Sequence, residues 1–235
     1  LMSAPPEAVR HYLDGKRLYR QGEFDDAIRG LRQALTVDST FALAALWLWE
    51  ANNMVVDPNL RGGPDAMAIA WAGRNRLPAE DARYVEAARA PTEHTRDGLR
   101  KWAGIVQQFP ERAEAWYRYG DAVFHYGPLV DMEDPIGSSA AAFDRALELD
   151  SAQAPALIHR GWIAAMRGDR DGYHRILELR ARREVHGAAT AGYAWELAAS
   201  RGDTVRLHAM VEAMDTLPIV DLFVLSMAPI NHIPP

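Results

Sequence analysis

The chain has 235 residues, of which 49% are hydrophobic and 25% are charged, and its formal net charge is −6. This apolar content is ordinary for a soluble globular protein and excludes disorder as the main state. The acidic balance argues against a general nucleic-acid-binding protein, because phosphate contacts need clustered Lys and Arg. The absence of cysteine excludes disulfide frameworks, thiolate zinc sites and cysteine nucleophiles.

The sequence predicts no insertion into a membrane by this segment. The longest apolar stretches, 41–49 and 217–228, are shorter than the roughly 18 residues that a spanning helix needs, and Asp221 interrupts the second. The first residues lack the charged and apolar regions of a signal peptide. The sequence does not decide between a cytoplasmic and an extracytoplasmic location. We expect the chain to be part of a longer protein.

Residues 12–39 predict two helices joined by a tight turn. Gly22 suits the left-handed conformation that ends many helices, and Gly15 is small where the two helices must approach. Apolar residues then recur with helical spacing on one face of the second helix, at Phe24, Ala27, Leu31, Ala34 and Leu35.

The same spacing returns three times further along the chain. It involves Trp116, Gly120, Val123, Phe143, Ala146 and Leu147, then Leu157, Gly161, Ala164, Tyr173 and Leu177, and finally Trp195, Ala198, Gly202, Leu207 and Val211. The first of these three units contains an insertion at 126–138 between its two helices. Repetition of one helical pair indicates a stack of similar units.

The pattern as a whole predicts helices and a few loops. The helices are expected near 5–21, 24–37, 41–54, 64–76, 79–90, 94–109, 112–126, 137–149, 153–167, 170–183 and 188–201, with one or two more up to 228. Loops are expected at the proline-containing segments 57–64, 127–136 and 228–235. Ser139 is expected to cap the beginning of the helix that contains Phe143.

These repeats resemble the tetratricopeptide-repeat (TPR) family, whose motif places a small residue in the first helix, Gly in the turn and alternating aromatic residues and Ala in the second helix. The resemblance implies an all-α fold, a right-handed superhelical stack of antiparallel helix hairpins (a TPR-like α-solenoid), and a single domain over 1–235. The sequence departs from the motif at Asp38-Ser39, where Pro is usual, and at Trp49, which stands in a small-residue position.

Three phrases, YLDGKRLYRQGEFDDAI, LTVDSTFALA and WYRYGDAVFHYGPL, resemble the TPR regions that follow a kinase or DNA-binding domain in some bacterial signalling proteins. This resemblance implies a sensory or interaction module of a bacterial regulatory protein. The chain itself contains no Gly-rich phosphate loop and neither of the kinase motifs HRD and DFG. The resemblance therefore implies no kinase activity for this chain.

In TPR proteins the first helix of each pair lines a concave groove that binds an extended peptide or a helix. The resemblance therefore implies a groove for a protein or peptide partner, and the alternative is that several of its aromatic residues pack between units. The candidate groove residues are Tyr12, Lys16, Tyr19, Arg20, Glu50, Asn53, Tyr117, Asp121, Phe124, His125 and Trp162.

Lys16 and Arg20 lie four residues apart on one helical face, an arrangement that could clamp a carboxylate or phosphate group. Such a clamp needs further cations from the next helix, which instead contributes Glu50 and Asn53. The clamp is therefore the weaker alternative to a peptide groove.

Asp121 and His125 are also four residues apart and could ligate a metal ion. Zinc needs three or four ligands, and neither HxxxH nor HExxH occurs, so we expect a hydrogen bond or ion pair and neither metal nor other cofactor. The acidic segment 131–134 lacks the EF-hand spacing and is expected to be a solvated loop. Because GxSxG is also absent, the sequence predicts a protein that is not an enzyme.

Seven tryptophans leave a further alternative open. Trp47, Trp49 and Trp71 could form a platform for a cofactor or a sugar. Two other functions also remain as alternatives to peptide binding. One is a small-molecule sensor with a pocket near 127–137, and the other is a structural subunit of a larger assembly.

Overall fold

The computed structural model describes residues 4–55, 65–89, 96–183, 195, 198–199 and 201–216, and these contain helices and turns without any strand. Parts of the prediction lie outside the described residues: most or all of the loops at 57–64 and 228–235, most of the helix at 188–201, and the stretch 217–228 in which a further helix was possible. The all-helical class is confirmed. The helices are α1 (Pro6–Gln21), α2 (Phe24–Val37), α3 (Ala42–Asn53), α5 (Ala66–Gly73), α6 (Ala79–Arg89), α7 (Arg96–Gln108), α8 (Ala113–Tyr126), α9 (Pro135–Leu149), α10 (Ala154–Met166), α11 (Arg170–Arg182) and α13 (Thr204–Glu212).

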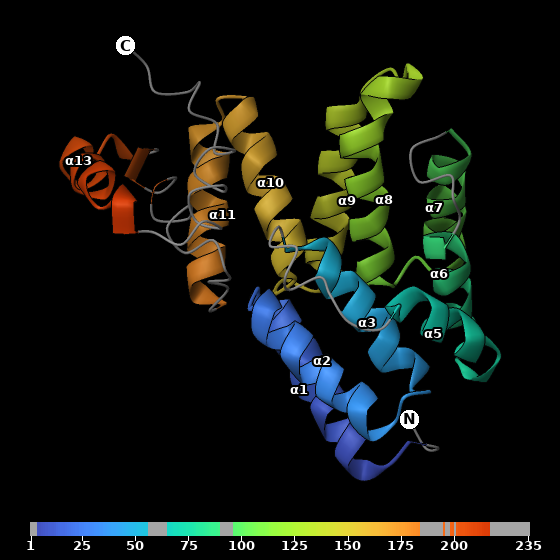
Figure 1. The fold of residues 1–235 in the computed structure, drawn as a ribbon. Coiled ribbons are helices and arrows are strands. Elements are labelled where there is room, and N and C mark those ends of the chain that lie inside the picture. Colours follow the sequence, from blue (N-terminus) through green and yellow to red (C-terminus); the bar gives the residue numbers. More distant parts are fainter. Residues whose placement is uncertain are drawn as a thin grey trace.

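Helices that follow one another in the sequence pack against one another in space. This holds from α1 and α2 through to α10 and α11, the pattern expected when each hairpin contacts its neighbours (Figure 1). In addition, α1 contacts α3 and α10. The arrangement is a TPR-like stack of helix hairpins. In this stack, α1 also contacts α10, which is far from it in the sequence.

Glycines allow the paired helices to approach closely. A Cβ atom added to Gly15 would lie 2.7 Å from Leu31 Cγ, and one added to Gly120 would lie 2.8 Å from Phe143 Cε1. Gly22 ends α1 with φ 83°, and its N–H bonds to the last turn of the helix. The roles predicted for Gly15 and Gly22 are therefore confirmed.

The segment inserted between α8 and α9 is more regular than predicted. Residues Gly127–Val130 form a 3₁₀ helix, and α9 begins at Pro135 instead of 137. Asp134 caps α9, because its Oδ1 accepts the Gly137 N–H at 2.8 Å. The prediction that Ser139 is the cap was wrong. Asp134 followed by Pro135 is the stronger start signal, since proline is preorganised for the first helical position.

Most of the buried side chains form a single cluster that extends from α1 to α10. Its central element is α3, which is apolar on nearly all sides and has nine buried residues. A helix of this kind must be surrounded by others. The core therefore includes α3, one of the helices that were expected to line a groove.

Candidate functional site

Four of the candidate groove residues lie in the core. The exposed fraction is 5% for Tyr12, 2% for Tyr19, 3% for Glu50 and 2% for Tyr117. Each aromatic ring among them packs against another ring, for example Tyr19 against Trp47 at 5.2 Å between centroids. These rings pack between units, as the alternative interpretation supposed, and they offer no surface to a partner.

Glu50 lies at the centre of a buried polar network. Arg118 of α8 approaches it with Nη2 2.7 Å from Oε2, and the Tyr84 hydroxyl of α6 donates to Oε1 at 2.6 Å. Burial raises the pKa of Tyr84 well above its ordinary value, and the nearby Glu50 charge raises it further. Burial alone would lower the pKa of Arg118, but the charge of Glu50 raises it. The network joins three helices and is structural.

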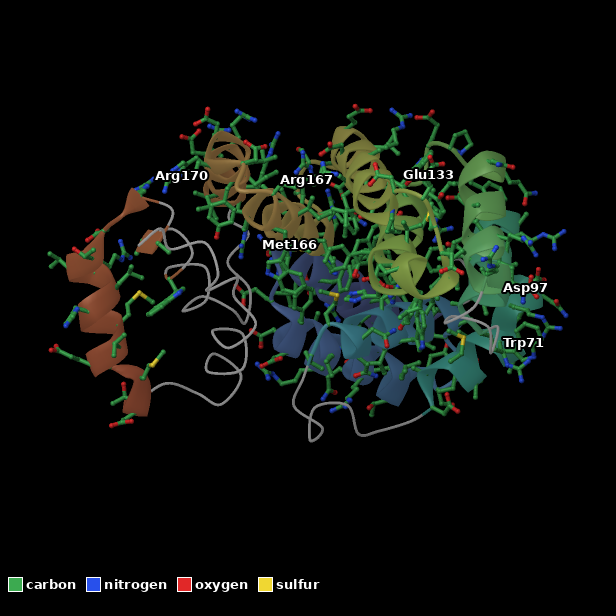
Figure 2. All side chains as sticks on the ribbon, turned by 90° about the horizontal axis from the view of Figure 1, so that it is seen from above. Trp71, Asp97, Glu133, Met166, Arg167 and Arg170 are labelled. Carbon is green, nitrogen blue, oxygen red and sulfur yellow. The ribbon has the colours of Figure 1, made fainter. Side chains whose placement is uncertain are left out.

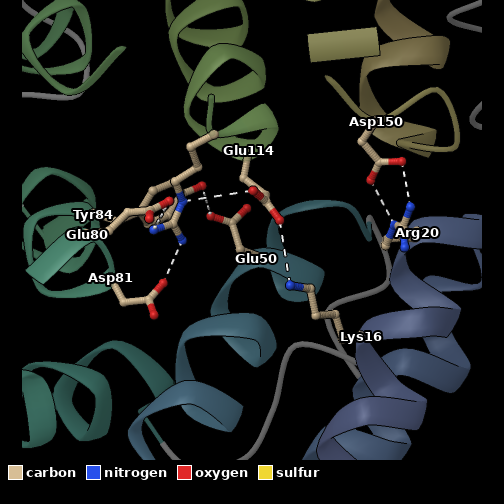
Figure 3. Close-up of polar contacts among 9 residues, drawn as sticks. Lys16, Arg20, Glu50, Glu80, Asp81, Tyr84, Glu114 and Asp150 are labelled. Atoms are coloured by element: carbon tan, nitrogen blue, oxygen red, sulfur yellow. Dashed lines mark hydrogen bonds and ion pairs between the residues drawn. The ribbon is translucent and has the colours of Figure 1, made fainter. Parts of the chain in front are cut away.

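The two candidate clamp cations are engaged within the chain (Figure 3). Lys16 Nζ lies 3.7 Å from Glu114 Oε1. The Arg20 guanidinium donates to both carboxylate oxygens of Asp150. The distances are 2.8 Å for Nε–Oδ2 and 2.6 Å for Nη2–Oδ1. A ligand anion would have to displace these carboxylates, because both cations already pair with residues from distant parts of the chain.

An accessible group of candidate groove residues lies on α8 and α10, which contact each other. Phe124 and Trp162 are half-buried, and the His125 side chain is 45% exposed. His159, on α10, joins them: its ring centroid lies 5.7 Å from that of Phe124 and 5.0 Å from that of Trp162. We call Asp121, Phe124, His125, His159 and Trp162 the aromatic–acidic face.

The surroundings of this face are also partly exposed. Met166, one turn beyond Trp162, is 48% exposed. Figure 2 shows it beside Arg167 at the end of α10, with Arg170 at the beginning of α11. With Met166, the apolar surface continues to the end of α10. Asn53, the remaining candidate groove residue, is exposed at the end of α3.

Asp121 is surrounded by three basic side chains. Its Oδ1 lies 3.5 Å from His125 Nε2 and 3.2 Å from His159 Nε2, and its Oδ2 lies 3.5 Å from Arg118 Nη1. The predicted pairing of Asp121 with His125 is confirmed. Burial alone would raise the pKa of Asp121, but the two imidazoles and Arg118 hold it well below its ordinary value. The interaction with Asp121 raises the pKa of His125.

His159 is the member of the group that sequence reasoning missed. It comes from a different helix, so no local spacing links it to Asp121. A usable signal was its place on α10, three residues before Trp162 and therefore on the same side of the helix. His159 is 4% exposed, which distinguishes it from the solvent-facing His125.

The three tryptophans of the alternative platform already have neighbours on their rings. Trp47 is 4% exposed. The guanidinium of Arg118 lies 4.6 Å from the centroid of Trp49. Arg74 and Arg89 lie 3.9 Å and 4.2 Å from the centroid of Trp71 (labelled in Figure 2). These contacts use the rings for packing and cation–π interactions.

Within the described part of the chain, every helix is too short or too polar to cross a membrane.

No protein-family model matches the chain, and no curated protein matches its sequence. Among solved structures it is similar to the crystal structure of yeast Tom70, with a TM-score of 0.48 and 14% sequence identity. The match covers 97% of this chain and 50% of the Tom70 chain, so this chain spans about half the length of that protein. The fold assignment rests on the helices and their packing described above.

Proposed function

We propose that this chain is a non-catalytic scaffold that binds a protein or peptide partner through the aromatic–acidic face of α8 and α10. The observation that supports it is the gathering of partly exposed aromatic rings from two neighbouring helices beside one carboxylate. Phe124 and Trp162 supply apolar area, while Asp121 and His125 supply polar contacts at its edge. This combination is typical of recognition surfaces, where aromatic anchors contribute most of the binding energy.

The packing behind this face favours binding at low entropic cost. α8 packs on α9, and α10 packs on α9 and α11, so the backbone of both helices is held in place. A surface that is already ordered loses little conformational freedom when it binds. We further propose that the scaffold is the sensory or interaction module of a bacterial regulatory protein, which is supported by the three phrases noted in the sequence.

The test is retention of partners from a lysate of the source cells by the wild-type chain and by Phe124→Ala/Trp162→Ala. We expect the double variant to bind the retained partner about thirtyfold more weakly or worse, because truncating one aromatic hot spot costs about 2 kcal/mol. Both side chains are only half-buried, so the helical circular dichroism signal should persist.

Leu13→Ala is the matched control, since Leu13 is a 51% exposed apolar residue on α1 and is not a member of the aromatic–acidic face. The control should retain the same proteins as the wild type. A folded double variant that retains them with unchanged affinity would remove this face from the binding site.

A further inference from the structure

We propose that Asp121, His125 and His159 form a zinc-binding site between α8 and α10. The atoms available as ligands are one carboxylate oxygen and two imidazole nitrogens, and all three lie within 4.8 Å of one another. Imidazole and carboxylate are ordinary ligands of Zn²⁺ in proteins. This inference needs no partner protein, so it stands or falls separately from the proposed function.

The orientation of His159 provides the main argument. Its Nδ1 lies 2.9 Å from the Pro155 carbonyl oxygen, which can only accept a hydrogen bond. Nδ1 therefore holds the proton, and in the neutral ring Nε2 presents a lone pair. This Nε2 lies 3.2 Å from Asp121 Oδ1, another acceptor. The contact is favourable only when a cation lies between the two atoms, either a proton or a metal ion.

A metal ion fits this orientation well. A histidine ligand usually donates its other N–H to a backbone carbonyl or a carboxylate, which fixes the ring and raises the basicity of the ligating nitrogen. His159 makes this bond to Pro155. Arg118 contacts the other oxygen of Asp121, with Nη1 3.5 Å from Oδ2, and this leaves Oδ1 to the two imidazoles.

Two of the three separations between ligand atoms match the size of a zinc site. Ligands about 2.0 Å from a tetrahedral Zn²⁺ lie about 3.3 Å apart. The two Nε2–Oδ1 separations are 3.2 Å and 3.5 Å. Any remaining adjustment falls on the distance between the two imidazoles, which His125 can shorten by rotation because its side chain is 45% exposed.

The surroundings distinguish an inner and an outer side of the site. His159 is covered by rings, with centroids of Phe143 at 5.1 Å and Trp162 at 5.0 Å. His125 is the most exposed of the three, so solvent reaches the group from its side, and within the described residues the group contains three side-chain ligands. Three protein ligands differ from the closed four-ligand arrangement of structural zinc sites.

The test is a titration of the full chain with ZnCl₂ in competition with a chromophoric chelator. We expect one saturable ion per chain in the wild type. Asp121→Asn preserves the shape of the side chain, and His125→Ala changes an exposed one, so both should fold. Each should weaken zinc binding by at least about tenfold, since even the loss of an outer partner of a ligand costs that much.

His208→Ala removes an exposed histidine of α13 and should bind zinc like the wild type. Addition of zinc should also move the ¹⁵N resonance of His159 Nε2 in the wild type. Unsaturable binding, or equal affinity in all four proteins, would overturn the proposal. So would a doubly protonated His159 ring that ZnCl₂ leaves unchanged, because a proton would then occupy the position assigned to the metal.

Discussion

At the scale of single residues, the buried tyrosines make stability depend on pH. Burial raises the pKa of Tyr12 to about 12 and raises the pKa of Tyr19 and Tyr84 well above their ordinary values. In the unfolded chain these phenols ionise near pH 10. The folded state therefore prefers the neutral phenol, and its stabilisation is complete below about pH 10 and lost as the pH rises.

We predict a cooperative alkaline unfolding between about pH 10 and 12, to which Tyr12 alone contributes about 3 kcal/mol. Absorbance of tyrosinate and helical circular dichroism should change together in a pH titration. Tyr12→Phe should show a shallower loss of stability over this range, because one ionising group is gone. Ionisation of all tyrosines near pH 10 in a chain that stays helical would contradict the prediction.

At the scale of elements, most helix boundaries could be predicted because local signals set them. The helix at 24–37 was predicted with the bounds that α2 has, and Gly22 ends α1 where expected. The predicted start of α9 at 137 was wrong because the pair Asp134-Pro135 is a stronger start signal than Ser139. Element bounds follow from nearby residues, so a sequence-based prediction can reach them.

The candidate site was harder to predict than the elements that support it. The TPR resemblance placed Phe124, His125 and Trp162 on inner helices, and they do share a face. It could not show that Tyr19 and Tyr117 are buried, since that depends on how tightly α1, α3 and α8 close on one another. Nor could it link His159 to Asp121, because their proximity comes from the packing of two hairpins.

At the scale of the whole molecule, ion pairs between distant segments close the stack on itself. Arg20 and Asp150 are 130 residues apart in the sequence. Glu50, Tyr84 and Arg118 connect α3, α6 and α8 inside the core. Because these contacts join separate hairpins, we expect the units to unfold cooperatively.

Removal of one member of the buried network should therefore destabilise the whole molecule. We predict that Glu50→Ala lowers the free energy of unfolding by about 3–5 kcal/mol, because the buried Arg118 would lose its closest carboxylate and keep only the more distant Asp121. Urea unfolding measures this. Glu50→Leu/Arg118→Met should recover part of the loss, since both charges of this buried pair are then removed together.

The matched control for that experiment is Arg145→Ala, which removes ion pairs to the exposed Glu111 and Glu148. Exposed pairs contribute at most about 1 kcal/mol, so this variant should unfold nearly like the wild type. If Glu50→Ala cost no more than Arg145→Ala, the network would not connect the hairpins energetically.

The central claim is that a protein partner contacts the aromatic–acidic face, and site-specific photo-crosslinking in the source cells tests it most directly. A photoreactive phenylalanine analogue replaces either Phe124, on this face, or Leu13, an exposed residue of α1. We predict a covalent adduct with one protein from position 124 and none from position 13. Equal adducts from both positions, or adducts from position 13 alone, would contradict the claim.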